Sequence, residues 1–210
     1  MRSVLYVIFR TIFVIPVRLI LRVHPKNRKN EPRRKEGPYI VCSNHQTVLD
    51  PVFLCVALRR QQPHYMGKES LFRVPVLGRI VRAFGAFPVT RGNNDVGAVK
   101  HTIALLKSGR CVGIFPQGTR CPGKDPRECP IKSGVGFMAA HTGAQILPAF
   151  IYMKDQTWKF FRRVTVVVGE PIPFEHFGYD ENRPGEYARI TAEVYEEICR
   201  LGDTVKAKKK

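Results

Sequence analysis

The 210-residue sequence contains no long, uninterrupted apolar run. Residues 3–23 are strongly apolar, but Arg10, Pro16, Arg18 and Arg22 interrupt them. A membrane-spanning helix needs about 20 apolar residues, and a central arginine costs roughly 2.5–3.5 kcal/mol on insertion scales. The pattern therefore favours a kinked helix that lies in the cytoplasmic leaflet. A helix packed on the soluble core and a single spanning helix are the two alternatives.

Acidic residues are scarce, with 17 Asp and Glu against 35 Lys and Arg, and the formal net charge is +18. Residues 1–35 carry a net charge of +9 and the tail 206–210 carries +4. These basic ends predict attachment to an anionic membrane surface, as a monotopic or peripheral protein at the cytoplasmic face of the cell membrane. The charge alone would also suit a nucleic-acid binder. Because the basic ends adjoin membrane-like apolar sequence, we expect no nucleic-acid partner.

The six cysteines include no CxxC pair, and their spacing is irregular. Most lie in or beside apolar runs, where a reduced cysteine acts as a small hydrophobic residue. This usage favours a reducing, cytosolic environment. Cys121, Cys129 and His141 could be imagined as metal ligands, but their spacing matches no zinc pattern, so no metal site is predicted.

No internal repeat, low-complexity linker or second domain is evident. We expect a membrane-associating helix and basic linker over 1–35, one domain over 36–205, and a basic tail over 206–210. Short apolar runs alternate with helical patterns, which predicts an α/β domain with a mostly parallel central sheet flanked by helices. The expected strands are 39–42, 64–67, 86–89, 111–115, 146–152 and 164–168.

Capping residues mark the expected helices. Asp50 suits an N-cap and Pro51 the first helical position. A second helix is expected from Asp95 to Gly109, and its apolar face comprises Val96, Val99, Ile103 and Leu106. A third is expected over 133–142 and ends at Gly143. The last ends at Gly202, and its apolar face comprises Tyr187, Ile190, Val194, Ile198 and Leu201.

His45 and Asp50 stand five positions apart, between an expected strand and an expected helix. Residues five apart in a regular helix diverge by about 140°, so a contact between them requires His45 on the turn and Asp50 at the helix start. A carboxylate that accepts one imidazole N–H fixes the ring and leaves the other nitrogen free as a base. The alternative is a buried histidine bonded to a capping aspartate with structural value alone.

Three further turns after expected strands carry cations. Arg91 follows the strand at 86–89, Gly118, Thr119 and Arg120 follow the strand at 111–115, and Lys132 precedes the helix at 133–142. Glycine turns, helix N-termini and arginine are the parts from which proteins build phosphate sites. A solvated cation on an exposed turn is the simpler reading of each one alone.

Together, four ordered blocks resemble the glycerolipid acyltransferase family, of the bacterial 1-acylglycerol-3-phosphate acyltransferase type. The blocks are Asn44-His45-x4-Asp50, Gly85–Gly92, Phe115–Arg120 and Ile146–Ala149, and the resemblance covers roughly residues 38–170. It implies the glycerolipid acyltransferase fold and acyl transfer from acyl-CoA or acyl-carrier protein to a glycerol hydroxyl. The acceptor would be lysophosphatidic acid or a similar lyso-lipid, and no cofactor would be needed.

The resemblance also implies a role for each matching residue. His45 would be the general base and Asp50 would orient it. Arg91 and the turn Gly118-Thr119-Arg120 would bind the acceptor phosphate, and Pro148 would lie in a block that positions the acyl chain or acceptor. Lys132 would suit the same anionic headgroup.

One position departs from the family pattern, because Gln117 stands where glutamate is usual. Glutamine keeps an acceptor oxygen but loses the charge and gains a donor. We therefore expect Gln117 among the substrate-binding residues and keep another lysophospholipid acceptor as an alternative. A lipid-binding protein that has lost catalysis is a further alternative, and a hydrolase is disfavoured because no G-x-S-x-G elbow is present.

Overall fold

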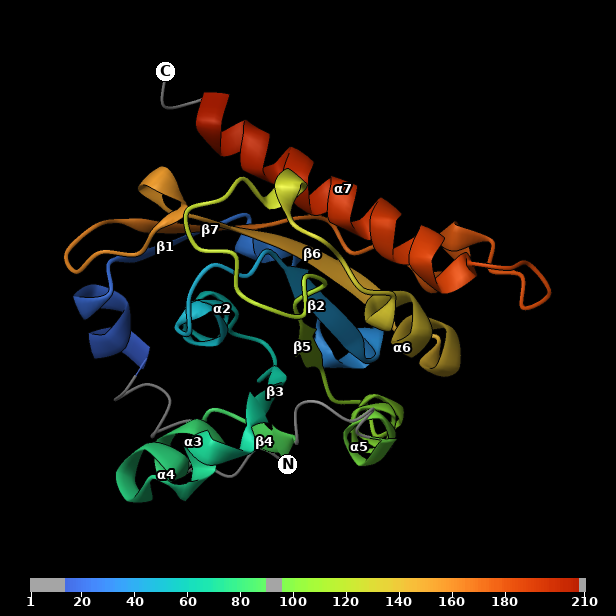
Figure 1. The fold of residues 1–210 in the computed structure, drawn as a ribbon, viewed down its shortest axis with the longest axis horizontal. Coiled ribbons are helices and arrows are strands. Elements are labelled where there is room, and N and C mark those ends of the chain that lie inside the picture. The colour runs from blue at the N-terminus through green and yellow to red at the C-terminus, as the bar shows by residue number, and fades with distance from the viewer. Residues whose placement is uncertain (1–13, 90–95, 208–210) are drawn as a thin grey trace.

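The computed structural model describes residues 14–89 and 96–207, and within them one seven-stranded sheet is flanked by helices (Figure 1). The strand order is β1-β7-β6-β2-β5-β3-β4. β6, β2, β5, β3 and β4 run parallel, whereas β7 is antiparallel to β6 and β1 is parallel to β7. The predicted α/β domain with a mostly parallel sheet is confirmed. The strands are β1 (Val23–Lys26), β2 (Tyr39–Ser43), β3 (His64–Lys68), β4 (Ala86–Val89), β5 (Val112–Ile114), β6 (Gln145–Tyr152) and β7 (Val164–Val168).

Helices cover both faces of this sheet. α2 packs on one face, and α5, α6 and α7 pack on the other, so two apolar clusters lie on opposite sides of the strands. The helices are α2 (Asp50–Ala57), α3 (Glu69–Arg73), α4 (Pro75–Ala83), α5 (Val96–Lys107), α6 (Gly134–Thr142) and α7 (Glu186–Ala207), with 3-10 turns η1 (Arg28–Asn30), η2 (Arg34–Glu36), η3 (Pro126–Glu128), η4 (Lys154–Gln156) and η5 (Phe174–Phe177).

The segment expected to be a basic linker is part of the fold. β1 (Val23–Lys26) pairs with β7, and Glu31 is buried just after it. The Glu31 carboxylate accepts hydrogen bonds from three consecutive backbone N–H groups, those of Arg59, Arg60 and Gln61, at 2.6–3.0 Å. A buried carboxylate is retained where such donors replace its water. Residues 23–31 therefore belong to the domain, and the expected linker is wrong for this stretch.

Residues 14–20 form a helix that leads into β1. Val14, Val17 and Leu21 pack against the apolar cluster beside α2, whereas Ile15, Leu19 and Ile20 are exposed. Within the described residues, no helix combines the length and the apolar content that crossing a bilayer requires.

α3 and α4 were not expected from the sequence, and α4 has an unusual orientation. Gly78 is its buried position, where an added Cβ would lie 2.5 Å from the carbonyl oxygen of Phe72. Val76 and Ile80 are exposed. The apolar side of α4 therefore faces away from the domain, which reverses the pattern by which amphipathic helices are recognised.

α7 continues beyond the residue expected to end it. Gly202 is buried inside the helix, and a Cβ there would come within 2.7 Å of the Phe150 ring. This glycine serves close packing on β6 and not helix termination, so the expected end at Gly202 is wrong. By contrast, Gly143 has a φ of +63° and ends α6 as expected.

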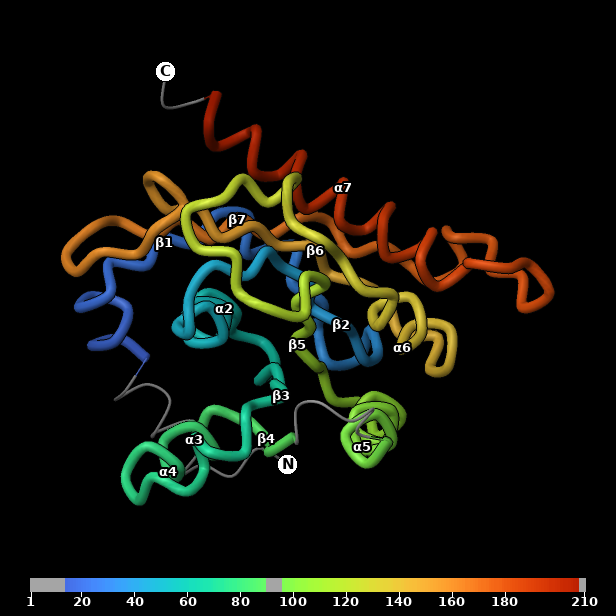
Figure 2. Tube along the Cα trace, viewed as in Figure 1, coloured from blue at the N-terminus to red at the C-terminus, as the bar shows by residue number. Residues whose placement is uncertain are grey.

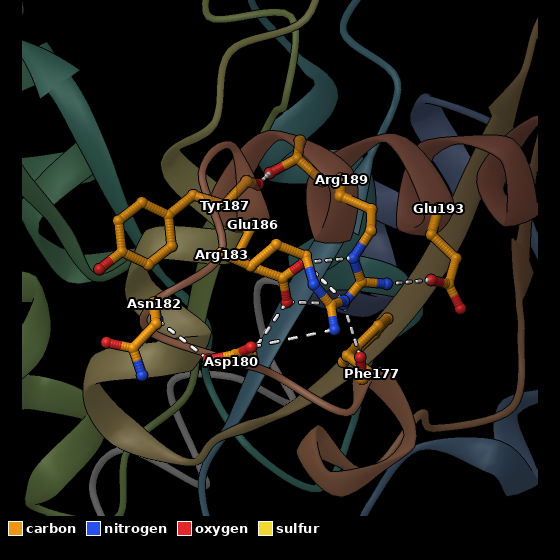
Figure 3. Close-up of polar contacts among 9 residues, drawn as sticks. Phe177, Asp180, Asn182, Arg183, Glu186, Tyr187, Arg189 and Glu193 are labelled. Carbon is orange, nitrogen blue, oxygen red and sulfur yellow. Dashed lines mark hydrogen bonds and ion pairs between the residues drawn. The ribbon is translucent and has the colours of Figure 1, made fainter.

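The first turn of α7 carries a cluster of charged groups (Figure 3). Glu186 accepts hydrogen bonds from the guanidinium groups of Arg189 and Arg183 and from the backbone N–H of Asp180. The hydrogen bond from Arg189 is the largest of the causes that lower the pKa of Glu186 to about 2. This cluster fixes the loop before α7 to the start of the helix.

All six cysteines are buried and carry free thiols. Burial raises the pKa of Cys42 and Cys111 far above the ordinary value, and that of Cys129 and Cys199 to about 11. They act as small core residues, as the sequence indicated. In the described part of the chain, no group of three or more His, Cys, Asp and Glu side chains is placed to hold a metal ion.

Candidate active site

His45 lies two residues beyond β2, at the carboxyl edge of the parallel strands, and Asp50 is the first residue of α2. Open α/β sheets place ligands at this edge. The imidazole Nδ1 of His45 lies 2.8 Å from Oδ2 of Asp50. The predicted contact between the turn and the helix start is therefore present. Leu49, and not Asp50, is the N-cap residue of α2, so the expected capping role of Asp50 is wrong.

The Asp50 carboxylate is fully buried and holds the turn that carries His45. Its Oδ2 also accepts the backbone N–H groups of Gln46 at 2.6 Å and Thr47 at 2.9 Å. Burial raises the pKa of Asp50, and the hydrogen bonds from His45 and the backbone oppose that rise. An ionised Asp50 can only accept, so Nδ1 of His45 carries the proton and Nε2 is left with a free lone pair.

Asn44 fixes the point at which the chain leaves the sheet. Its amide donates to the carbonyl of Ile151 at 3.0 Å and accepts the N–H of Ile151 at 2.8 Å. The Asn44 side chain thus makes the two hydrogen bonds with Ile151 that a further backbone residue of β2 would otherwise make with β6. Asn44 is part of the first sequence block, but its sequence position alone gave it no role.

An aromatic stack supports the His45 ring. The Phe115 ring lies 4.1 Å from the imidazole, at an interplanar angle of 14°, and the Tyr65 ring lies 6.0 Å beyond Phe115. Gly113 makes room for this stack, because a Cβ there would lie 1.8 Å from the Tyr65 ring. Phe115 was missed as a site residue, and its place in the third sequence block was the available signal.

Gln117 is buried and contacts the main chain of His45. Its Oε1 accepts the backbone N–H of His45 at 2.5 Å. The amide nitrogen is buried without an oxygen or nitrogen partner among the described residues and faces the thiol of Cys129. The structure therefore places Gln117 in the interior, where it holds the His45 turn, and not on an exposed surface as the sequence suggested.

The turn after Gln117 carries several of the predicted phosphate-binding residues. Gly118, with a φ of +65°, packs against the aliphatic part of Lys132. Thr119 and Arg120 are exposed, and the next residue, Cys121, donates its N–H to the carbonyl of His45 at 2.9 Å. Thr119 and Arg120 therefore lie on the segment 117–121, which contacts His45 at both of its ends, and Lys132 packs against that segment.

The two remaining predicted residues lie elsewhere. Pro148 is buried in β6, in register with Cys42, and a Cβ at Gly169 would lie 2.9 Å from its ring. Its position is in the core of the sheet, and the expected contact with the acyl chain or acceptor stays a prediction. Arg91 lies outside the described residues.

This arrangement can be compared with known proteins. The acyltransferase family model matches residues 22–152, which include His45, Asp50 and the turn at 117–120. The chain belongs to the acyltransferase family. The matched region extends from just before β1 to the end of β6, so it contains all the described parts of the candidate site.

Relatives of this acyltransferase carry a common name. A Bacillus subtilis protein, named 1-acyl-sn-glycerol-3-phosphate acyltransferase, is 30% identical over 155 residues, which cover 73% of this chain and 75% of the relative. A Streptococcus pneumoniae protein of the same name is 32% identical over 153 residues, or 71% of this chain and 55% of the relative. The chain thus spans about half the length of the second relative.

A solved structure shares the fold. The crystal structure of the 1-acyl-sn-glycerophosphate (LPA) acyltransferase PlsC from Thermotoga maritima superimposes with a TM-score of 0.71. The match covers 99% of this chain and 84% of that one at 23% identity. At this identity the likeness supports the architecture of the acyltransferase domain.

Proposed function

We propose that this protein transfers a fatty acyl group from an acyl thioester to the free hydroxyl of 1-acylglycerol 3-phosphate, forming phosphatidic acid for phospholipid synthesis. The observation that carries the proposal is the 2.8 Å contact between His45 and the buried Asp50, at the carboxyl edge of the parallel strands. The names of the Bacillus and Streptococcus relatives support the same acceptor.

In the proposed reaction, Nε2 of His45 removes the acceptor hydroxyl proton while the hydroxyl oxygen attacks the thioester carbonyl carbon. The tetrahedral intermediate collapses, the carbon–sulfur bond breaks, and the imidazolium returns its proton to the leaving thiolate. Asp50 stabilises the imidazolium. General base catalysis of this kind contributes about 10²–10⁴-fold, and alignment of the two substrates adds to it. No covalent acyl-enzyme, metal ion or other cofactor takes part in these steps.

The acceptor phosphate would bind to the exposed turn of Gly118, Thr119 and Arg120, together with Lys132. Charge-assisted hydrogen bonds from guanidinium and ammonium groups suit a phosphate, and a glycine turn adds backbone N–H donors. Arg91 is proposed for the same headgroup. Acyl-CoA or acyl-carrier protein would be the acyl donor. The reaction would take place at the cytoplasmic face of the cell membrane, where the protein would be attached through its basic ends as a monotopic or peripheral protein.

The test is transfer from purified acyl-CoA or acyl-carrier protein to lysophosphatidic acid. His45→Ala should lower the rate by at least about 10²-fold while circular dichroism shows an unchanged fold. His141→Ala is the matched control. This exposed histidine lies near the C-terminal end of α6, whereas His45 follows the carboxyl end of β2. Transfer at the wild-type rate by His45→Ala would sink the mechanism. A preference for another lyso-lipid in the same assay would replace the proposed acceptor.

A further inference from the structure

An exposed aromatic and basic loop connects η4 to β7. It comprises residues 157–163, with the sequence Thr-Trp-Lys-Phe-Phe-Arg-Arg. Phe160 and Phe161 are 55% and 71% exposed, although large aromatic side chains are usually covered in a folded domain. Lys159 and Arg163 are exposed beside them. Aromatic and cationic side chains that alternate in this way suit the interface between water and lipid.

The outward position of the two phenylalanines is fixed by the rest of the domain. Trp158 packs against the apolar cluster beside α2 and lies edge-on to Phe160, with ring centroids 5.7 Å apart. Phe161 has a φ of +61°, which bulky residues rarely adopt, and its carbonyl accepts a hydrogen bond from Arg22 at 2.7 Å. The loop therefore presents its aromatic tip through specific contacts.

Arg22 also joins this loop to the N-terminal helix. Figure 2 shows residues 14–22 beside the turn between β6 and β7. The outer side of that helix exposes Ile15, Leu19 and Ile20, which are 52%, 70% and 55% exposed. Two segments far apart in the sequence thus give one surface that is apolar at its tips and cationic at its base. We define these segments, 14–22 and 157–163, as the rim.

The rim lies next to the catalytic turn. Loop 157–163 follows the carboxyl end of β6, which is parallel to the strand that leads to His45. The carbonyl of His45 accepts the N–H of Cys121, and two residues later Gly123 donates its N–H to the carbonyl of Gln156 at 3.1 Å. A single short segment, 121–123, therefore contacts both the His45 turn and the start of the loop.

We propose that the rim is the surface by which this protein docks on an anionic lipid bilayer, with Phe160 and Phe161 inserted among the acyl chains and Lys159 and Arg163 at the headgroups. This inference rests on the proposed function, because a bilayer is the source of the lyso-lipid acceptor. Charge complementarity and exposed apolar tips identify the occupant. Docking here brings the membrane to the edge of the sheet that carries His45.

Trp158 makes the proposal directly measurable, because it is the chain's only tryptophan. On titration of the full chain with phosphatidylglycerol–phosphatidylcholine vesicles, its emission should shift to the blue. Lipids with brominated acyl chains should quench it. Pure phosphatidylcholine vesicles should bind more weakly, since the cationic part of the rim then has no anionic partner. Unchanged emission in the presence of bound vesicles would overturn the proposal.

Variants assign the binding to the loop. Phe160→Ser with Phe161→Ser should weaken vesicle binding, measured by cosedimentation, by at least about ten-fold. Lys159→Gln with Arg163→Gln should reduce the preference for phosphatidylglycerol, and the basic ends of the chain account for the preference that remains. Val96→Ser is the matched control, because Val96 is an equally exposed apolar residue on α5. Wild-type affinity in the double phenylalanine variant, with its fold intact by circular dichroism, would refute the proposal.

The same experiments distinguish bilayer docking from other partners of the rim, and they distinguish failure of the docking proposal from failure of the proposed function. Bilayer docking would be overturned if the protein formed a dimer that the phenylalanine variant abolishes. It would also be overturned if the rim bound acyl-carrier protein and not vesicles. Acyl transfer to a monomeric short-chain acceptor should be unchanged in the phenylalanine variant. Vesicle binding through the rim without acyl transfer to any lyso-lipid would refute the proposed function and leave the docking surface intact.

Discussion

The side-chain oxygen of Gln117 accepts the backbone N–H of His45, so a residue 72 positions away holds the turn that carries His45. Gln117→Glu preserves this acceptor, and the thiol of Cys129 can donate to the second oxygen. We expect acyl transfer within about ten-fold of wild type and an unchanged order of lyso-lipid acceptors. An acceptor series measured by kcat/KM checks this, and a changed order would contradict the assignment.

The isosteric control at the same position is Gln117→Leu. It leaves the His45 N–H buried without an acceptor, which costs about 1–3 kcal/mol. We expect a clear loss of kcat and of stability, both larger than in Gln117→Glu. Equal behaviour of the two variants would show that the hydrogen bond is unimportant.

Gly113 tests the aromatic stack behind His45. Gly113→Ala places a Cβ where the Tyr65 ring now lies, so Tyr65 and then Phe115 must move. We expect destabilisation of about 1–3 kcal/mol in chemical denaturation and a lower kcat, because the imidazole loses its support. Gly134→Ala, at the start of α6 with open space around it, should be nearly neutral in both measurements.

The cluster at the start of α7 predicts a pH-dependent contribution to stability. The pKa of Glu186 is lowered from 4.5 to about 2 in the folded protein, so its contribution is complete above pH 4.5 and is lost as the pH falls toward 2. Thermal unfolding of wild type and Glu186→Gln should therefore differ most near neutral pH. The difference should shrink between pH 4.5 and 2, and a constant difference would contradict the role of Glu186.

Truncation separates membrane attachment from folding. Removal of residues 1–13 leaves β1 and Glu31 in place, so we expect a folded protein with weaker binding to anionic vesicles. Removal of 1–35 deletes β1 and exposes the edge of β7, which offers unpaired backbone groups to other chains. We expect that longer truncation to aggregate in size-exclusion chromatography. A monodisperse protein lacking 1–35 would show that β1 is dispensable.

Local patterns were sufficient for the centre of the fold but not for its edges. Alternation of apolar runs and capped helices predicted the parallel strands and α6. β1 was missed because Pro25 and its charged neighbours have no strand pattern of their own, and β7 supplies the pairing. The sequence did not predict α4, because the apolar side of this helix faces outward. Gly202 was misread because its contact with Phe150 belongs to tertiary packing.

The candidate site divides in the same way. The spacing of His45 and Asp50 predicted their contact, since a strand end and a helix start restrict the geometry strongly. Gln117 was assigned to the substrate because its partner, a backbone N–H on another loop, cannot be seen in sequence. The sequence did not predict a surface at 157–163 for a related reason, because the fold decides which aromatic side chains are exposed.

The six buried cysteines have a practical consequence for labelling. Thiolates react with maleimides and iodoacetamide, and the raised pKa values of Cys42, Cys111, Cys129 and Cys199 keep those thiols protonated near neutral pH. Burial also keeps all six from the reagent. A cysteine introduced on the surface, such as Phe160→Cys, would therefore react first, and a fluorophore or spin label could be attached without removing any native cysteine.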